Sequence, residues 1–239
     1  MIAMSSPSKE NTFSTPPPGH VRAMFDRVAR RYDLMNRLMT FGQDTRWRKE
    51  VIRRARLTPG ARLLDLGAGT GDLAWEALQQ EPTTLPVAVD FSLEMMRMGQ
   101  RRGRSLAWTA GDALSLPFPE NVFDAVVSAF LVRNVRDVPR LLREKYRLLR
   151  PGGRLVILDT TRPRAGVLQP LVRLYLRTII PLLGALVAGL REDYDYLVTS
   201  TENFLRAEEL AAHMAAAGFR RIGFRRLMFG TVAIHWGEK

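Results

Sequence analysis

Apolar and polar positions follow a helical period at the start of this chain. Apolar side chains recur three and four positions apart at Val21, Met24, Phe25, Val28, Ala29 and Tyr32, which predicts a helix with one buried face. The same period predicts a second helix at about 44–56, with Trp47, Val51, Ile52 and Ala55 turned inward. Its basic residues are expected to point largely outward: Arg46, Arg48, Lys49, Arg53 and Arg54.

Beyond residue 60 the pattern is typical of a parallel sheet covered by helices on both faces. Short apolar runs predict strands at about 62–66, 86–89, 106–110, 124–130 and 153–158, with helices at about 72–80, 93–102 and 138–149. A helix at about 207–217 precedes two strands, near 221–225 and 231–236, that can pair as a hairpin. We therefore expect an α/β fold: a doubly wound, Rossmann-like, seven-stranded sheet with a terminal antiparallel hairpin and an N-terminal helical extension.

The same pattern suggests the domain boundaries. Residues 1–20, rich in Ser, Thr and Pro, predict a disordered tail before a single domain at 21–239. Within that domain, 21–58 form the N-terminal helices and 166–205 form a helical insertion or lid. The most apolar part of the insertion, 166–190, is interrupted by Arg173 and Arg177, so it falls short of the roughly 20 apolar residues that span a membrane. With no signal-peptide layout at the N-terminus, we expect a cytoplasmic protein.

Composition narrows the chemistry. The 239 residues include no cysteine, which excludes disulfides, Cys-ligated metal centres and a thiol nucleophile, and three scattered histidines predict no metal site. There are 36 basic and 24 acidic residues, a net charge of +12. Residues 1–60 hold 12 of the basic and 5 of the acidic groups, so the N-terminal quarter is expected to attract anionic surfaces, either nucleic acid or phospholipid headgroups.

A glycine-rich loop follows the first predicted strand. It reads Leu-Leu-Asp-Leu-Gly-Ala-Gly-Thr-Gly-Asp over 63–72, and its glycines let the backbone approach a ligand closely. The third glycine of a dinucleotide fingerprint would fall at Asp72, where a carboxylate suits a pyrophosphate poorly, so a nicotinamide cofactor is disfavoured. Asp90 ends the second strand, 19 residues after Gly71, where a carboxylate can accept both ribose hydroxyls. Asp112 follows the third strand, although either aspartate alone fits a helix cap or a turn equally well.

This G-x-G-x-G loop with its two acids resembles the first motifs of class I S-adenosylmethionine-dependent methyltransferases. The resemblance implies S-adenosylmethionine as the methyl donor, with Asp112 recognising the adenine amino group. The cofactor-binding residues that it implies are Gly67, Gly69, Thr70, Gly71, Asp90, Asp112 and Ala113.

Further motifs resemble the ubiquinone/menaquinone biosynthesis C-methyltransferase family over about residues 22–237. They are Tyr32-Asp33-Leu34-Met35-Asn36, Thr40-Phe41-Gly42 with Trp47, Arg133-Asn134-Val135, the run 148–153 with Asp159, the block 194–204, and Ala233-Ile234-His235. The chain departs from the family at Asp44 and Thr45, where His-Arg is usual, and at Ala129, where a serine is common. The resemblance implies C-methylation of a polyprenylated quinol precursor, demethylmenaquinol or its ubiquinone-pathway equivalent. It leaves the choice of quinone nucleus open.

The resemblance also makes Arg133, Asn134 and Tyr32 the candidate catalytic residues. A hydroquinone hydroxyl must lose a proton, so that the adjacent ring carbon can attack the sulfonium methyl, and the enzyme supplies alignment and stabilises the phenolate. Arg133 is expected to stabilise the phenolate or to orient a water, because a guanidinium stays protonated below about pH 12. Asn134 is expected to hold the ring oxygen or that water, and Tyr32 to cover the cofactor. Arg133 could instead have a structural role, in a salt bridge to Asp137. His235 is a candidate proton acceptor, but it could equally be a buried residue of the core.

Two other functions compete with this interpretation. The basic charge suggests an RNA methyltransferase, but Ser128-Ala129-Phe130-Leu131 stands where many amino-group methyltransferases carry an Asn/Asp-Pro-Pro-aromatic tetrad, and no aromatic-rich basic patch appears. We therefore expect no nucleic-acid partner. A non-catalytic accessory protein at the membrane surface is the other alternative, disfavoured by the intact loop. The expected location is cytoplasmic and peripheral at the inner face of the cell membrane, and the oligomeric state stays open, a homodimer included.

Overall fold

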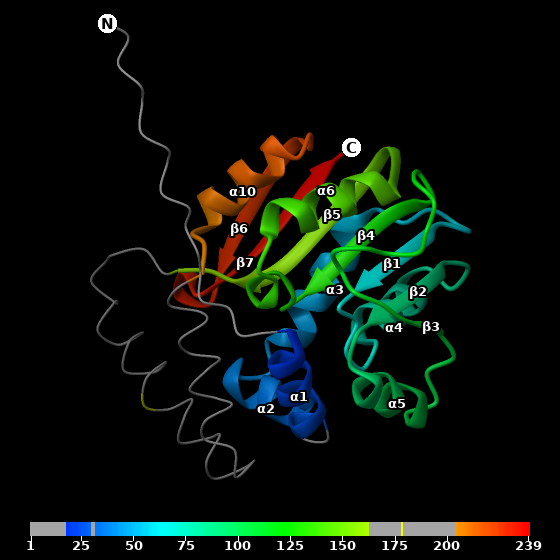
Figure 1. Ribbon diagram of the computed structural model, residues 1–239, viewed down its shortest axis with the longest axis vertical. Coiled ribbons are helices and arrows are strands. Elements are labelled where there is room, and N and C mark those ends of the chain that lie inside the picture. The colour runs from blue at the N-terminus through cyan, green and yellow to red at the C-terminus, as the bar shows by residue number, and fades with distance from the viewer. Residues whose placement is uncertain (1–17, 30–31, 163–177, 179–203) are drawn as a thin grey trace, which may run out of the picture.

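A computed structural model describes residues 18–29, 32–162, 178 and 204–239 of this chain, and Figure 1 shows them around a central sheet. The strands are β1 Arg62–Leu66, β2 Leu85–Asp90, β3 Ala107–Ala110, β4 Phe123–Ala129, β5 Leu149–Thr160, β6 Arg220–Leu227 and β7 Val232–Glu238. The helices are α1 Pro18–Val28, α2 Tyr32–Met39, α3 Asp44–Ala55, α4 Asp72–Gln80, α5 Leu93–Arg101, α6 Val138–Leu148 and α10 Ala207–Ala216, with short 3₁₀ turns η1 Val132–Asn134 and η4 Met228–Gly230.

The sheet has seven strands in the order β3-β2-β1-β4-β5-β7-β6. Strands β1 to β5 pair in parallel, whereas β7 runs antiparallel to both β5 and β6. The predicted doubly wound α/β sheet with its terminal hairpin is thereby confirmed. Strand order reverses between β1 and β4, and in open α/β sheets ligands bind at such a switch point, beyond the carboxyl ends of the strands.

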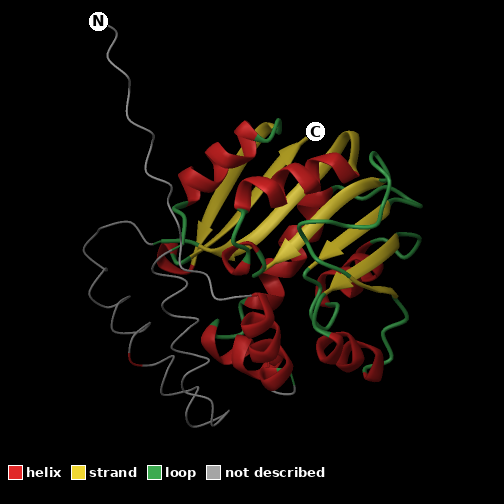
Figure 2. Cartoon of the chain, in the orientation of Figure 1, coloured by secondary structure: helices red, strands yellow, loops and turns green. Residues whose placement is uncertain are grey.

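Two apolar layers hold helices against the two faces of the sheet. Figure 2 shows the helices (red) packed against the strands (yellow). Adjacent residues of the central strands supply both layers, because successive side chains of a strand point to opposite faces. Thus Leu64 and Val126 pack with α6 and α10, whereas Leu63 and Val127 pack with α3 and α4. This burial on both faces explains why β1 and β4 appear in the sequence as continuous apolar runs.

The N-terminal helices differ from the sequence prediction. The helical period from Val21 to Tyr32 does not form one helix: α1 ends at Val28 and a second helix, α2, begins at Tyr32. Helix α1 also begins at Pro18, within the segment predicted as a tail, since proline is favoured in the first turn of a helix. Phe41 and Gly42, both with positive φ, then turn the chain into α3.

Strand β5 is longer than predicted. Pro151 and Gly152, which precede the predicted strand 153–158, lie inside β5, where the register against β4 jumps from Phe123↔Leu149 to Ala125↔Arg154. Most of the predicted insertion 166–205 and residues 1–17 of the predicted tail lie outside the described residues. Within the part of the chain that the structure describes, no helix has the length and apolar character needed to cross a membrane.

Candidate active site

A cavity of about 210 Å³ opens at the carboxyl edge of the parallel strands. Its wall includes the ends of β1, β2 and β4, together with Phe25 of α1, which lies across this edge of the sheet. Among the described residues most of the wall is apolar, and the polar side chains are Asp90, Asp112, Asn134 and Arg136. An apolar cavity with a few convergent polar groups is the usual form of a small-molecule site.

The glycine loop forms one side of this cavity. Gly67, Gly69 and Gly71 all have positive φ, which side-chain-bearing residues rarely adopt. The loop is fixed to β2, because the N–H groups of Gly67 and Ala68 both donate to the carbonyl oxygen of Val89, at 2.8 and 3.0 Å. A Cβ atom at position 67 would lie 2.9 Å from Cδ1 of Leu131, another residue of the cavity wall.

We expect Gly67→Ala to destabilise the protein by roughly 2–5 kcal/mol, because the positive φ is strained with a Cβ and the methyl group overlaps Leu131. Gly152→Ala is the matched control: its φ is also positive, +78°, but a Cβ there meets nothing within 4 Å. The control should lose only about 1–2 kcal/mol. Denaturant unfolding of both variants measures the difference, and equal losses would show that the close approach to Leu131 has no cost.

Asp90 and Asp112 lie together in the cavity wall, as the sequence predicts for a nucleoside site. Asp90 is held rigidly: its Oδ2 accepts from the N–H of Gly69 at 2.7 Å and its Oδ1 from the N–H of Ser92 at 2.8 Å. Burial raises the pKa of Asp90, while these backbone donors act in the opposite direction. Asp112 accepts from the N–H of Leu114 at 2.9 Å, so both carboxylates are oriented by backbone.

The predicted cofactor residues divide between two cavities. Gly67, Gly69, Asp90, Asp112 and Ala113 line the large cavity. Thr70 instead lines a second, smaller cavity of about 30 Å³, which shares Gly67 and Gly69 with the first. Gly71 lines neither and serves as the left-handed residue before α4. The glycine loop therefore separates two adjoining spaces.

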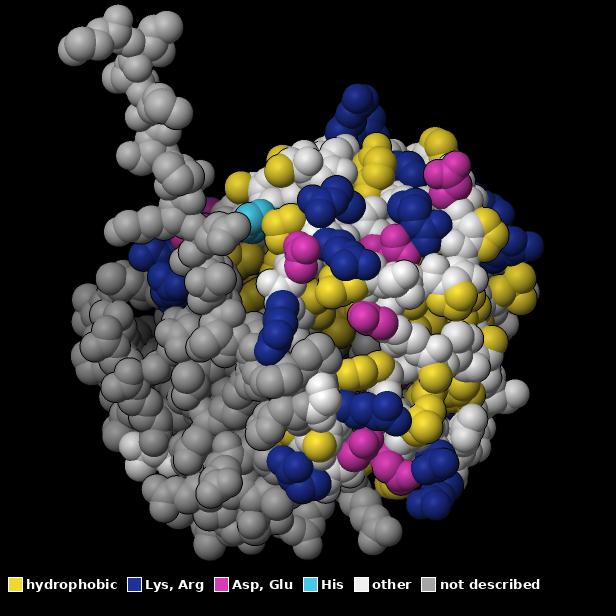
Figure 3. Space-filling view, in the orientation of Figure 1, with side chains coloured by type: hydrophobic (Ala, Val, Ile, Leu, Met, Phe, Trp, Pro, Cys, Tyr) yellow, Lys and Arg dark blue, Asp and Glu magenta, His cyan; other side chains and the backbone are white. Residues whose placement is uncertain are grey.

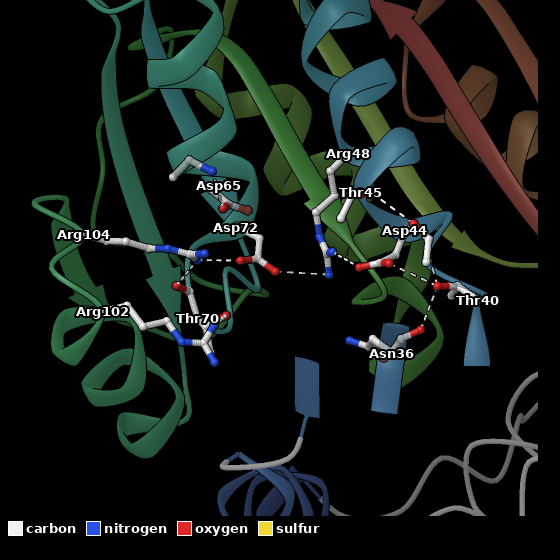
Figure 4. A network of polar contacts seen from close by, with 12 residues as sticks. Asn36, Thr40, Asp44, Thr45, Arg48, Asp65, Thr70, Asp72, Arg102 and Arg104 are labelled. Carbon is white, nitrogen blue, oxygen red and sulfur yellow. Dashed lines mark hydrogen bonds and ion pairs between the residues drawn. The ribbon is translucent and has the colours of Figure 1, made fainter. Parts of the chain in front are cut away.

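An ion-pair network surrounds the small cavity and ties α3 to the glycine loop (Figure 4). Arg48 lies between Asp44 and Asp72, bonding both, with an N–O separation of 3.2 Å to Asp72. Arg104 approaches Asp72 from the other side at 2.5 Å and donates to the carbonyl oxygen of Thr70 at 2.7 Å. Burial raises the pKa of Asp72, but Arg48 and Arg104 outweigh it and lower the pKa. The prediction that Arg48 points outward is wrong, because it is only 8% exposed.

Asp65 is a further wall residue of the small cavity that the sequence did not single out. Its Oδ2 accepts from the N–H of Ala74 at 3.0 Å, while its buried Oδ1 has no hydrogen-bond partner within the described part of the chain. Burial raises its pKa to about 7. A buried carboxyl oxygen without a partner is costly, so Asp65 is a natural acceptor for a ligand donor.

Arg133 and Asn134 are consecutive residues of η1, but their side chains have different surroundings. Asn134 lines the large cavity, and its Nδ2 donates to the carbonyl oxygen of Phe130 at 3.0 Å. The Arg133 side chain is 7% exposed and forms an ion pair with Asp159 at 3.0 Å; it is not among the described residues of the cavity wall. The alternative of a salt bridge to Asp137 is wrong, because the Asp137 carboxylate caps α6 by accepting from the N–H of Arg140 at 2.8 Å.

Two other candidates have different outcomes. Tyr32 begins α2, but its side chain lies outside the described structure, so its predicted role as a cover for the cofactor stays a prediction. His235 is 2% exposed, and its Nε2 donates to the carbonyl oxygen of Ala207 at 2.9 Å. This burial confirms the core position and lowers the pKa of His235 to about 4, and His235 is not among the described residues of the cavity wall.

Comparisons with known proteins concern the chain as a whole. A sequence profile of the ubiE/COQ5 methyltransferase family matches residues 12–239. The chain is 44% identical over 224 residues to the ubiquinone/menaquinone biosynthesis C-methyltransferase UbiE of Desulfotalea psychrophila, covering 93% of this chain and 91% of that protein. It is 43% identical over 220 residues to the demethylmenaquinone methyltransferase of Thermus thermophilus, covering 90% of this chain and all of that protein.

A solved structure supports the fold independently. The SAM-dependent methyltransferase of Thermotoga maritima superposes with a TM-score of 0.64 at 20% sequence identity, covering 92% of this chain and all of that one. Similarity at that identity concerns the arrangement of the chain alone.

Proposed function

The chain belongs to the ubiE/COQ5 methyltransferase family, and we propose that it methylates a ring carbon of a polyprenylated quinol, demethylmenaquinol, with S-adenosylmethionine as the methyl donor. The observation that carries this proposal is the cavity at the switch point, where two backbone-oriented aspartates face a mostly apolar wall. Such a wall suits both a nucleoside and the ring of a quinol.

The residues present fit the cofactor. Asp90 has carboxylate lone pairs left for the ribose hydroxyls, and Asp112 is placed to accept from the adenine amino group. The orphaned Oδ1 of Asp65 in the adjoining small cavity would accept from the ammonium group of the methionine end. When bound, S-adenosylmethionine supplies an electrophilic methyl group on a sulfonium. The glycine loop between the two cavities lets the backbone approach it closely.

The chain's own groups then serve the quinol. The apolar wall formed by Phe130, Leu131 and Val135 receives the ring and excludes water, which strengthens every electrostatic interaction inside. Asn134 holds the ring oxygen, and the proton of this oxygen passes to a water molecule. Arg133 precedes Asn134 in the chain and is held in place by its ion pair with Asp159. It supplies positive potential where the phenolate charge develops. This combination favours attack by the adjacent ring carbon.

The decisive experiment incubates the purified protein with S-adenosylmethionine and reduced demethylmenaquinone, and identifies the quinone product by mass spectrometry. Menaquinone, with the methyl group on the quinone ring, is the expected product. A demethylated ubiquinone precursor in a parallel reaction tests the other nucleus, and RNA tests the competing substrate class. Methylation of RNA but of neither quinol would overturn the proposal, and a failure to bind S-adenosylmethionine would favour the accessory protein.

We also propose that the protein works at the inner face of the cell membrane, where a polyprenylated quinol resides. Supporting observations are the exposed apolar side chains at and just after α2, Leu34, Leu38 and Phe41, which lie close to the basic residue Arg37. On the face shown in Figure 3, Lys and Arg side chains are scattered among acidic and apolar ones instead of gathering in one patch. Apolar side chains with nearby arginines suit an interface with anionic lipid.

We expect the protein to co-sediment with anionic phospholipid vesicles at low salt and to be released as the salt concentration rises. The double variant Leu34→Ser/Phe41→Ser should bind these vesicles more weakly, because it removes two exposed apolar side chains. Leu85→Ser is the control: Leu85 is similarly exposed, at 56%, but begins β2 at the opposite edge of the sheet. Equal binding to anionic and neutral vesicles would remove the electrostatic part of the proposal.

A further inference from the structure

A lysine lies fully enclosed in the protein next to the candidate active site. Lys145 belongs to α6 and has no exposed surface. It occupies the inward face of that helix, between the buried Leu141, Leu142 and Leu148, where the helical period places an apolar residue. A charge in such a position is costly unless the structure uses it. Neither the cofactor site nor the proposed methyl transfer accounts for Lys145.

The contacts of Lys145 place it under the end of β4. Its Nζ donates to Oγ of Ser128 at 2.6 Å, so its hydrogen-bond partner is a neutral hydroxyl. Ser128 stands directly before Ala129, a wall residue of the large cavity. The alternation along β4 directs these two side chains to opposite faces, Ala129 toward the cavity and Ser128 toward α6.

Few charged groups face Lys145 from the surrounding elements. Asp159 faces it from β5 and Asp65 acts on it from β1, and both favour its charged form. Helix α10 turns the apolar Ala207, Leu210 and Met214 inward, and His235 on β7 is kept neutral by burial. The cost of burial is the larger effect, and it lowers the pKa of Lys145 to about 7.

Asp159 connects this lysine to the active-site wall. Its carboxylate accepts from the N–H of Val132 at 2.7 Å and of Thr160 at 2.8 Å, and it forms the ion pair with Arg133. One carboxylate therefore holds the short η1 turn that carries Asn134 into the cavity. With Lys145 charged, two buried cations, Arg133 in contact and Lys145 at longer range, act on this carboxylate. With Lys145 neutral, Arg133 is the one cation of the two that acts on it. At low local dielectric this difference extends beyond direct contact.

We propose that Lys145 is a positioning residue whose protonation weakens the hold of Asp159 on Arg133, loosens the turn Val132–Asn134 and lowers turnover. The inference rests on the proposed function, because it is the quinol that Asn134 would contact. The nucleoside part of the S-adenosylmethionine site is unaffected, since Asp90 and Asp112 follow other strands and are oriented by their own backbone partners.

A first experiment follows the proton without any substrate. The chain has four lysines, at positions 9, 49, 145 and 239, so carbon-13 labelling of lysine gives four NMR signals, and Lys145→Met identifies one of them. That signal should titrate near pH 7, and the backbone amides of Val132–Asn134 should shift with the same midpoint. The amide shifts should vanish in Lys145→Met, an apolar replacement of similar length, and persist in Lys49→Met, which changes an exposed lysine.

A second experiment measures turnover against pH. A single group with a pKa of about 7 that must be deprotonated gives a kcat about 10-fold higher at pH 8 than at pH 6. This contribution should be missing from the pH profile of Lys145→Met and present in that of Lys49→Met. At each pH the Kd for S-adenosylmethionine should be the same in wild type and in both variants. Should Lys145→Met not fold, Ser128→Ala removes the acceptor of the ammonium group and should move the midpoint to lower pH.

Three results would overturn the inference: a Lys145 signal that titrates above pH 9, amide shifts of Val132–Asn134 that survive in Lys145→Met, or equal pH profiles in wild type and Lys145→Met. Failure of the proposed function gives a different result. In that case no menaquinol forms at any pH, while the NMR titration still decides whether Lys145 controls the turn.

Discussion

We expect Asp90→Ala to bind S-adenosylmethionine about 10- to 150-fold more weakly, a loss of about 1.5–3 kcal/mol. The substitution removes the charged acceptor of two ribose hydroxyls in the wall of the large cavity. It also frees the N–H groups of Gly69 and Ser92, which the carboxylate holds at 2.7 and 2.8 Å. The glycine loop would then lose one of its fixed points, so the expected change lies in cofactor affinity. Isothermal calorimetry measures it directly.

Two further variants sharpen this test. Asp90→Asn keeps one carbonyl oxygen as an acceptor and should lose less affinity than Asp90→Ala. Asp124→Ala is the matched control, because Asp124 also accepts from a backbone N–H, that of Arg62 at 2.8 Å, but it lies near the amino end of β4, away from the cavity. Unchanged affinity in Asp90→Ala would place the ribose elsewhere, and an equal loss in Asp124→Ala would point to a general effect on the fold.

The sheet and the glycine loop were predictable because their signals are local. Each parallel strand is a short apolar run, and the glycines that need positive φ stand together at 67, 69 and 71. The N-terminal helices show the limit of such signals. The apolar period runs without interruption from Met24 through Ala29 to Tyr32, so it predicts one buried face and gives no sign that the chain ends one helix and begins another.

The charged groups around the site were harder to predict, because their partners are distant in sequence. In the sequence Arg48 is one of several basic residues of a helix. Its ion pair with Asp72, at the end of the glycine loop, forms only in the folded chain. Arg133 lies 26 residues from Asp159, and the nearby Asp137 was the only partner that spacing offered. Lys145 carries no local signal of burial apart from its place on the apolar face of α6. The site therefore depends on ion pairs between residues far apart in the sequence, which hydrophobic periodicity does not predict.

The largest expected effect is that of Arg133→Ala on turnover. If Arg133 stabilises charge that develops only when the quinol is deprotonated, its loss should lower kcat by roughly 10²–10³ and leave the Kd for S-adenosylmethionine nearly unchanged. This pattern is opposite to that of Asp90→Ala. Arg133→Lys should restore only part of the rate, because an ammonium keeps the charge but lacks the planar fork. Arg140→Ala, which changes an exposed arginine of α6, is the control.

The ion pair with Asp159 gives this prediction a second, structural explanation that has to be separated from the first. Removing Arg133 takes the ion-pair partner from a carboxylate with 1% side-chain exposure, which costs about 3–5 kcal/mol of stability. The double variant Arg133→Met/Asp159→Asn removes both charges and keeps an oxygen that can accept from the N–H of Val132. Stability should recover in this variant while kcat stays low, because the positive potential is still missing. Recovery of kcat together with stability would show that Arg133 only neutralises Asp159, and Asn134 would then become the residue that meets the phenolate.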